Sequence, residues 1–462
     1  MRQINLTSFK DVPLTRKRGF PKRINTQLYF FRTEDGRICA YTPIGNIAAL
    51  LSNSEYEFAR THNFVNSNVE GMEELLDSFV YTVQSVNAAY PSGTALSFSP
   101  KIDKDKIREL SLIVSTACNL RCRYCFALGG ESAAIEEQKG VSGLRQELDP
   151  DAALYAVRHF KPAKIVLFGW GEPTMALSSL KRIVADIDTA KIEVEIVTNG
   201  VYLSKREEIV RYLVEHHIRI ELSFDGLPEF QDKYRPLANG GGSASEVLKT
   251  IEEIKRYGRL ADFATVRATV CGGMENRIQE CVDYLHSLGF ETISIQPVEM
   301  SGRAVDNVKL PDLDLFARNI ARAIANGKEQ GINVDSRVLP AGSSWSMACY
   351  GCGFMAGYML ALGPDLNFYA CDDPLPIFRV GAMEHRRDGF EIDVNYDKLT
   401  EFANKRYALN LKNCSECPVK CGGGCTKESL ATYGSIDVGG ESEELCSSRR
   451  EALAEYIRCA LA

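Results

Sequence analysis

The chain is poor in histidine and has no long hydrophobic run. Only six of its 462 residues are histidine, and they are scattered, so zinc sites that mix cysteine with histidine are not favoured. No run reaches the ~18 apolar residues that a membrane-spanning helix needs. The basic first 25 residues lack the apolar segment of a secretory signal peptide. We therefore expect a cytoplasmic protein with no membrane partner.

The chain also lacks an excess of positive charge. Its net charge is −7, which argues against a nucleic-acid partner because such proteins present basic surfaces to phosphates. The apolar fraction of 45% and the charged fraction of 25% are those of a globular protein. The length is enough for about three domains, each with a core of its own.

Cysteine, in contrast, is abundant, with fifteen residues. Disulfides are rare in the cytosol, so clustered cysteines in a chain without an export signal indicate metal ligands or catalytic groups. Three of them form a C-x3-C-x2-C motif: Cys118, Cys122 and Cys125. Eight more lie between residues 349 and 446. The four isolated ones are expected to be buried hydrophobic residues: Cys39, Cys271, Cys281 and Cys459.

Between residues 111 and 330, short β-rich runs alternate with helical stretches. We expect strands at 111–115, 164–169, 193–198, 218–224, 265–270 and 292–298. We expect helices at 152–160, 177–188, 205–216, 244–257, 277–288 and 313–329. Six β/α units in series predict an α/β fold, with a parallel sheet and the helices outside it. Active sites of such sheets lie at the carboxyl ends of the strands, and the three-cysteine motif directly follows the first strand. Residues 129–148 are expected to form a mobile loop.

The sequence patterns at the two ends of the chain differ from the alternation seen in residues 111–330. Residues 28–41, with Asp35-Gly36 at the turn, predict a β-hairpin, and 47–58 and 72–83 look helical. Residues 340–446 show few periodic runs, so we expect metal rather than a large apolar core to hold them. Residues 447–462 read as a closing helix.

The three-cysteine motif and the strand ends resemble the radical S-adenosylmethionine (SAM) superfamily. The matching elements are C-x3-C-x2-C followed by the aromatic Phe126, Gly171-Glu172-Pro173, Thr198-Asn199-Gly200 and Ser223. The resemblance implies a partial (β/α)6 barrel and a [4Fe–4S] cluster on Cys118, Cys122 and Cys125, with SAM on the fourth iron. One electron would then release a 5′-deoxyadenosyl radical, which abstracts a substrate hydrogen in a dry cavity.

The same resemblance implies the residues that contact SAM. Gly171, Glu172 and Pro173 would contact its amino group, although Trp170 stands where a glycine is usual. The other candidates are Phe126 near the adenine, Asn199 and Ser223 near the ribose and carboxylate, and Arg235 or Arg267 on the carboxylate. The alternatives are a surface ion pair for either arginine and simple core packing for Phe126.

The second cysteine group has the spacing Cys414-x2-Cys417-x3-Cys421-x3-Cys425, with three glycines inside it. A pair of zinc ribbons is one interpretation. The group also resembles the SPASM domain, although Leu366 replaces a usual glycine upstream of Cys371. That domain would place one auxiliary [4Fe–4S] cluster on Cys349, Cys352, Cys371 and Cys425, and a second on Cys414, Cys417, Cys421 and Cys446. With three clusters in all and both auxiliary ones fully ligated, we expect the auxiliary clusters to transfer electrons.

Two further residue sets carry hypotheses. In sulfatase-maturing relatives an aspartate at the position of Asp372 deprotonates the substrate; a solvated turn residue is the alternative. Residues 1–100 loosely resemble a winged-helix module that binds a leader peptide at a sheet edge; an unrelated cap is the alternative.

These observations predict a radical SAM oxidoreductase that forms a thioether or carbon–carbon cross-link in a ribosomally synthesised precursor peptide. Its electrons would come from a donor such as flavodoxin or ferredoxin. The expected domains are 1–100 (possible peptide recognition), 101–335 (barrel), 336–446 (SPASM) and 447–462 (closing helix). The alternatives are formylglycine formation, as in anaerobic sulfatase maturases, and a non-catalytic iron–sulfur electron carrier.

Overall fold

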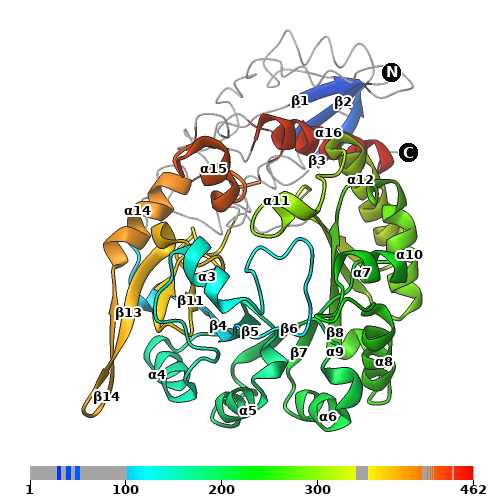
Figure 1. The fold of residues 1–462 in the computed structure, drawn as a ribbon. Coiled ribbons are helices and arrows are strands. Elements are labelled where there is room, and N and C mark those ends of the chain that lie inside the picture. The colour runs from blue at the N-terminus through cyan, green and yellow to red at the C-terminus, as the bar shows by residue number, and fades with distance from the viewer. Residues whose placement is uncertain are drawn as a thin grey trace.

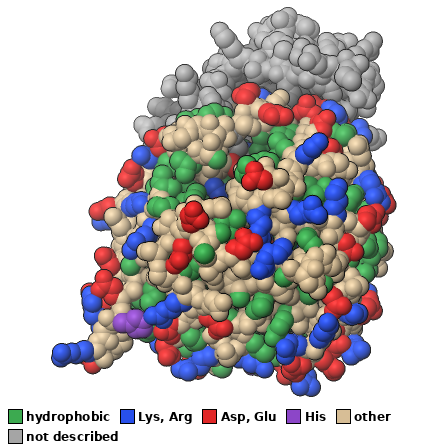
Figure 2. Space-filling view, in the orientation of Figure 1, with side chains coloured by type: hydrophobic (Ala, Val, Ile, Leu, Met, Phe, Trp, Pro, Cys, Tyr) green, Lys and Arg blue, Asp and Glu red, His purple; other side chains and the backbone are tan. Residues whose placement is uncertain are grey.

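The computed structural model describes residues 29–32, 38–42, 47–51, 101–339, 352–407, 421–439 and 442–460, with the single residues 411, 414, 417 and 419. Acidic and basic side chains are intermixed over the visible face of these residues (Figure 2). None of the helices among them combines the length and the apolar character that crossing a membrane requires.

One eleven-stranded sheet forms the centre of the molecule, in the order β10-β9-β8-β7-β6-β5-β4-β11-β12-β13-β14. The strands from β10 to β11 in this order are parallel to their neighbours. They are β4 (Glu109–Ser115), β5 (Lys164–Gly169), β6 (Glu193–Thr198), β7 (Arg219–Ser223), β8 (Ala264–Val270), β9 (Thr292–Pro297), β10 (Asn333–Asp335) and β11 (Met359–Leu362). Their carboxyl ends therefore meet at one edge of the sheet.

Helices follow one another around the outside of these strands (Figure 1). They are α4 (Pro150–Phe160), α5 (Leu177–Ala185), α6 (Glu207–Glu215), α8 (Ala244–Lys255), α10 (Ile278–Ser287) and α12 (Leu313–Glu329). Each is amphipathic; α6, for example, buries Ile209, Val210 and Leu213 against the sheet. A side-chain cap marks the start of two of them, α4 and α12. At α12 the Asp312 carboxylate accepts a hydrogen bond from the Leu315 amide at 2.9 Å.

The six predicted β/α units are confirmed. β5, β6 and α12 have the predicted bounds, and the other four predicted strands deviate by at most two residues at either end. Residues 129–148 are not a loop throughout, because they contain α3 (Ser132–Lys139). Short segments complete the connections: η2 (Lys104–Lys106), η3 (Pro173–Met175), η4 (Leu203–Lys205), α7 (Pro228–Tyr234), α9 (Leu260–Phe263), η5 (Glu275–Arg277), α11 (Ala304–Asn307) and η6 (Pro376–Phe378).

The region after residue 352 is built onto the same sheet. β11 pairs with β4, and an antiparallel meander continues from it. Its other elements are β12 (Asn367–Tyr369), β13 (Arg379–Arg386), β14 (Gly389–Val394), α14 (Tyr396–Arg406) and α15 (Thr426–Tyr433). Phe368, Phe378 and Phe402 are buried between them. The expectation that metal rather than an apolar core holds this region is therefore wrong for residues 359–407.

Leu366, which replaces a usual glycine, keeps the backbone conformation of a glycine. Its φ is +61°, in the left-handed region where a side chain clashes with the backbone. The turn holds it there, since the Leu366 amide donates to the Gly363 carbonyl at 2.9 Å and its carbonyl accepts from the Met383 amide at 2.7 Å.

The closing helix α16 (Glu443–Ala460) begins earlier than predicted, so that Cys446 lies in its first turn. It packs along α12. The contact includes an ion pair between Arg322 Nε and Glu455 Oε1 at 2.6 Å and a hydrogen bond from Ser448 Oγ to Asp314 Oδ1 at 3.1 Å. The cysteine-rich end is thereby fixed to the outer helix layer.

Before residue 100 the structure describes one three-stranded antiparallel sheet, β1-β2-β3. The predicted hairpin is confirmed by β1 (Tyr29–Arg32) and β2 (Ile38–Thr42). The helix expected from residue 47 is wrong at its start, because β3 (Ile47–Leu51) pairs there with β2. The helix expected at 72–83 lies outside the described residues.

The buried apolar layer behind β12 leads to a first prediction. Phe368→Ala should lower the free energy of unfolding by about 3–5 kcal/mol, because it leaves a cavity where the ring was fully buried. Urea unfolding of the full chain, with and without reconstituted iron, measures this. Phe390→Ala, at a half-buried position on β14, should cost less. An iron-free protein indifferent to Phe368→Ala would mean that the tail is held by metal after all.

Candidate active site

A cavity of about 520 Å³ lies at the carboxyl ends of the parallel strands. It is lined by many of the predicted site residues: Cys118, Cys122, Cys125, Phe126, Gly171, Glu172, Asn199, Ser223, Arg235, Arg267, Cys352, Cys371, Asp372 and Cys425. Other predicted residues are not part of this lining: Pro173, Cys414, Cys417, Cys421 and Cys446. Cys349 lies outside the described residues. The cavity thus brings the first cysteine motif and part of the second group to one place.

The loop with the first three cysteines is held along its backbone. The Arg121 amide donates to the Pro236 carbonyl and the Arg123 amide to the Tyr234 carbonyl, both at 2.8 Å. Between the first two cysteines, Asn119 Oδ1 accepts a hydrogen bond from Asn199 Nδ2 at 2.8 Å. Asn199 therefore fixes this loop relative to the end of β6.

The cysteines of this loop are partly buried, and the thiols of Cys118 and Cys125 face amide donors. Burial raises the pKa of Cys118 to about 12 and that of Cys122 to about 11. The Leu120 amide lies 3.5 Å from Cys118 Sγ, and the Gly129 amide lies 3.4 Å from Cys125 Sγ. Buried thiols give up their protons when a metal takes its place, and amide donors stabilise cluster thiolates. The donor set fits an iron–sulfur cluster with three protein ligands.

The turn after β5 approaches this loop so closely that only glycine fits at position 171. The Gly171 amide donates to the Ser115 carbonyl at 2.9 Å and the Glu172 amide to the Ala117 carbonyl at 2.7 Å. A Cβ atom on Gly171 would lie 2.1 Å from the Ala117 oxygen. The turn and the cysteine loop are therefore packed backbone against backbone.

Trp170 is accommodated because its side chain points away from this contact. It is 1% exposed, and its ring lies edge-on to Tyr369 with the centroids 5.9 Å apart. Its Nε1 donates to the carbonyl of Asp372 at 2.9 Å. A position that is usually glycine thus connects the turn to the segment after Cys371.

The carboxylate of Glu172 is fully engaged within the chain. Oε1 accepts from the Thr174 amide at 3.1 Å, the Thr174 hydroxyl at 2.5 Å and the Thr198 hydroxyl at 2.6 Å. Oε2 accepts from the Asn199 amide at 2.8 Å. Burial raises the pKa of Glu172, and these donors oppose that shift. A carboxylate has about four acceptor positions, so Glu172 braces β5 against β6. Pro173 begins η3 directly after it.

Sequence reasoning missed a buried cluster next to Cys122. The Tyr124 hydroxyl donates to Asp225 Oδ2 at 2.6 Å and accepts from Arg235 at 2.9 Å. Burial raises the pKa of both Tyr124 and Asp225. Arg235 lines the cavity, and its Nε is buried without a partner, so it is not a surface ion pair. The aromatic residue directly before the third cysteine was the available signal.

Arg267 on β8 and Asp372 directly after Cys371 both line the cavity. Arg267 is solvent-accessible inside the cavity. Burial raises the pKa of Asp372 to about 6, while the charges of Arg267 and Lys427 act in the opposite direction. Asp372 Oδ1 is buried and has no hydrogen-bond partner. Asp372 as a whole lines the cavity, so its carboxyl group lies beside the space that a substrate would enter.

The later cysteines lie in two groups. Cys352, Cys371 and Cys425 line the cavity, and burial raises the pKa of Cys371 with the Cys425 thiol adding to the shift. Burial raises the pKa of Cys414 to about 12, and its neighbouring thiols act in the same direction: Cys421, Cys417 and Cys446. No three His, Cys, Asp or Glu side chains among the described residues form a site for a single metal ion. In an iron–sulfur cluster each thiolate binds its own iron.

One arginine organises the loops between these cysteines. Arg406 at the end of α14 is buried, and its guanidinium donates to the carbonyls of Gly423 at 2.6 Å and Gly424 at 3.1 Å. It also donates to the carbonyls of Ile436 and Val438 at 3.0 and 2.9 Å. The glycine loop before Cys425 and the chain leading to α16 are therefore held at one point.

The contact at Gly171 leads to a second prediction. Gly171→Ala should abolish cluster binding by the first cysteine motif, because the added methyl group would push the turn off the cysteine loop. Iron content and cluster absorbance of the reconstituted protein measure this. Gly241→Ala is the control, since its Cβ would meet only side-chain atoms at 3.3 Å or more. Equal iron content in Gly171→Ala and the unchanged protein would contradict the prediction.

Comparisons with known proteins agree with this geometry. Residues 112–285 match the Radical SAM superfamily. A serine-type anaerobic sulfatase-maturating enzyme of Klebsiella aerogenes is 25% identical over 330 residues, 68% of this chain and 78% of the relative. The radical SAM cyclopropyl synthase TigE of Paramaledivibacter caminithermalis is 23% identical over 350 residues, 72% of this chain and 70% of the relative.

Two solved structures share the fold. Native anSMEcpe with bound AdoMet has a TM-score of 0.59 at 19% identity, over 76% of this chain and 98% of that one. Streptococcus suis SuiB bound to the precursor peptide SuiA has a TM-score of 0.51 at 14% identity, over 88% of this chain and 96% of that one. The matched domain and its cysteine motif show that the chain contains a radical SAM domain at residues 112–285 and is an enzyme similar to these maturating and modifying enzymes.

Proposed function

We propose that this enzyme oxidatively modifies a ribosomally synthesised peptide in the cavity between its two cysteine-bearing regions. The observation that carries the proposal is the shared lining: Cys118, Cys122 and Cys125 of the first motif, together with Cys352, Cys371 and Cys425 of the later group. A group held in this cavity would be within reach of both. Residues 101–335 would form the partial (β/α)6 barrel, and 336–446 the SPASM domain.

The family's cofactors are SAM and a [4Fe–4S] cluster, and Cys118, Cys122 and Cys125 would hold that cluster. When bound, the pair supplies one-electron chemistry that removes a hydrogen atom from the substrate. Residues of this chain position the cysteine loop and the strand ends that would hold SAM and the cluster. Asn199 fixes the cysteine loop, and Glu172 braces the two strand ends beside it. Gly171 brings backbone close to the loop, as a SAM-contacting turn requires.

The remaining polar groups of the lining divide between the two sides of the cavity. Arg235 lies on the side of Cys122, whose pKa its charge lowers, and its unpartnered Nε is suited to the SAM carboxylate. The charge of Arg267 lowers the pKa of Asp372 instead, so Arg267 is proposed to face the substrate. Ser223 and Phe126 line the cavity and would contact SAM from the end of β7 and from the cysteine loop.

The later cysteines would hold two auxiliary [4Fe–4S] clusters. The structure groups Cys352, Cys371 and Cys425 in one place, and Cys349 would complete their set. The second set is Cys414, Cys417, Cys421 and Cys446. Glycines between Cys421 and Cys425 allow the chain to wrap closely around such a group. Full ligation by protein favours uptake of the electron that the substrate gives up.

Asp372 is the proposed base. Asp372 lines the cavity, and a proton lost from the substrate would be held on its carboxylate. A carboxylic base that is raised toward neutral pH by burial is suited to this task. The connection from Trp170 Nε1 to the Asp372 carbonyl fixes the backbone beneath it.

Two similar proteins bear on the reaction and on the substrate, and SuiB is the one that supports a peptide substrate. TigE is a cyclopropyl synthase, and SuiB has been solved with a precursor peptide. A cross-link, thioether or carbon–carbon, removes two hydrogens from the peptide. The reducing electrons would come from a donor such as flavodoxin or ferredoxin, and residues 1–100 are proposed to bind the leader peptide.

Formylglycine formation is the second candidate. It is favoured by the likeness to a serine-type sulfatase-maturating enzyme and by the position of Asp372 in the cavity lining. A sulfatase-derived peptide that contains the target serine or cysteine would then be converted to an aldehyde. The electron-carrier alternative is not retained, because the chain is an enzyme.

The test is to incubate the reconstituted enzyme with reductant, SAM and a short peptide encoded beside its gene. We expect 5′-deoxyadenosine together with a peptide that has lost two hydrogens. An aldehyde formed on a sulfatase peptide would select the second candidate. The absence of both modified peptides, with clusters intact, would exclude peptide modification.

The position of Asp372 leads to a third prediction. Asp372→Asn should leave SAM cleavage to 5′-deoxyadenosine nearly unchanged but reduce modified peptide by about 10²–10⁴-fold, the usual contribution of a general base. Quantifying both products in one assay measures this. Asp393→Asn, exposed on β14, is the control. A variant that still makes modified peptide at the full rate would show that Asp372 is not the base.

A further inference from the structure

Six charged side chains of alternating sign form a chain beside the cavity. Lys139 Nζ lies 2.8 Å from Asp373 Oδ1, and Asp373 Oδ2 lies 3.6 Å from Lys427 Nζ. Lys427 Nζ lies 2.5 Å from Glu299 Oε2. The sequence of charges is Lys139, Asp373, Lys427, Glu299, Arg337 and Glu428. With three cations and three carboxylates, the chain of charges is neutral.

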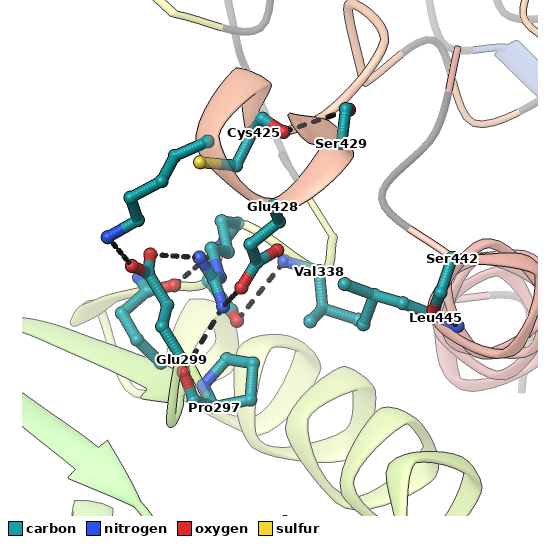
Figure 3. Close-up of polar contacts among 12 residues, drawn as sticks. Pro297, Glu299, Val338, Cys425, Glu428, Ser429, Ser442 and Leu445 are labelled. Atoms are coloured by element: carbon teal, nitrogen blue, oxygen red, sulfur yellow. Dashed lines mark hydrogen bonds and ion pairs between the residues drawn. The ribbon is translucent and has the colours of Figure 1, made fainter. Parts of the chain in front are cut away.

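This chain of charges joins parts of the molecule that are far apart in sequence. Glu299 lies after the end of β9, and Glu428 lies on α15. Figure 3 shows their side chains pointing toward one another, and both carboxylates pair with Arg337. Arg337, which pairs with both, follows β10. Lys139 ends α3, which follows the first cysteine motif. Asp373 lies two residues after Cys371.

Lys427 is the central cation, and it lies among the cysteines. It follows Cys425 by two residues in α15 and is 8% exposed. Its ammonium lies 4.4 Å from the centre of the Phe126 ring, directly after the third cysteine of the first motif. Its charge also acts on the Cys371 thiol. A buried cation thus lies between the first cysteine motif and the pair Cys371 and Cys425.

We propose that Lys427 raises the reduction potential of the auxiliary cluster held by Cys371 and Cys425, so that this cluster takes up the electron that the substrate releases. The inference rests on the proposed function, which supplies that cluster. The substrate radical would lose one electron, the cluster would gain it, and the proton would go to Asp372. Atoms and charges balance without a further oxidant.

The physical reason is the charge that reduction adds. A cluster with four thiolates becomes more negative when it gains an electron, and net charge near it is one of the factors that set its potential. A buried cation opposes that added charge with little screening by water. The pairs with Glu299 and Asp373 hold Lys427 in place while Arg337 and Lys139 compensate these carboxylates. Removing Lys427 would leave one uncompensated negative charge.

Two variants of opposite sign test the proposal. Lys427→Met should shift the auxiliary potential downward, and Glu299→Gln should shift it upward. We expect at least a tenfold change in the equilibrium constant for one-electron reduction, about 59 mV. Lys427→Arg keeps the charge and should restore most of the potential. Lys181→Met is the matched control, because Lys181 also lies over a ring, 5.2 Å from that of Tyr212 on α6, outside the cavity lining.

The measurement is a potentiometric titration of each reconstituted holoenzyme followed by electron paramagnetic resonance. The signal that changes when SAM is added identifies the cluster of the first motif, and the second auxiliary cluster is an internal reference. Only one transition should move in Lys427→Met. If all three clusters are present and no transition moves, or if Lys427→Met and Glu299→Gln shift in the same direction, the inference is overturned. Iron for only one cluster would instead contradict the proposed function.

Discussion

The buried carboxylate of Glu172 is the group around which the first half of the cavity is arranged. It accepts hydrogen bonds from the segments after β5 and β6, and the amide of the same residue donates to the cysteine loop. An ionised carboxyl can be buried because its acceptor positions are filled. Asn199, whose amide is one of these donors, then orients Asn119 between the first two cysteines. The positions of the thiols thus depend on a side chain that need not touch a ligand.

Much of the parallel sheet could be predicted from sequence because its signals are local. Runs such as 164–169 and 193–198 are rich in β-branched residues, and the helices between them have a clear period. The tail was harder. β12 is only three residues long, and its burial comes from β11 and β13, which no local pattern indicates. The sequence predicts a helix at Ile47–Leu51 because a short apolar run fits both a helix and a strand. Pairing with β2 makes this segment a strand.

The candidate site shows the same division. Cysteine spacing indicated the thiols, a strand-end position indicated Asn199, and the resemblance to sulfatase-maturing enzymes indicated Asp372 directly after Cys371. Contacts between distant segments could not be read from the chain: Lys139 with Asp373, Tyr124 with Asp225, and Trp170 with the Asp372 carbonyl. Each joins residues more than 100 positions apart, and only the folded sheet brings them together. Where Trp170 and Leu366 replace usual glycines, the sequence alone could not show how the backbone adapts.

The helix α16 has two structural roles: it carries Cys446, and it packs along α12. Its first turn carries Cys446, and Arg449 one turn later donates to Cys421 Sγ at 3.6 Å. The rest of the same helix lies along α12, through contacts such as that of Arg322 with Glu455. Because α16 is one continuous helix, a movement of these thiols would be transmitted to α12 in the outer helix layer. A change at Cys446 would therefore also alter the contact between α16 and α12.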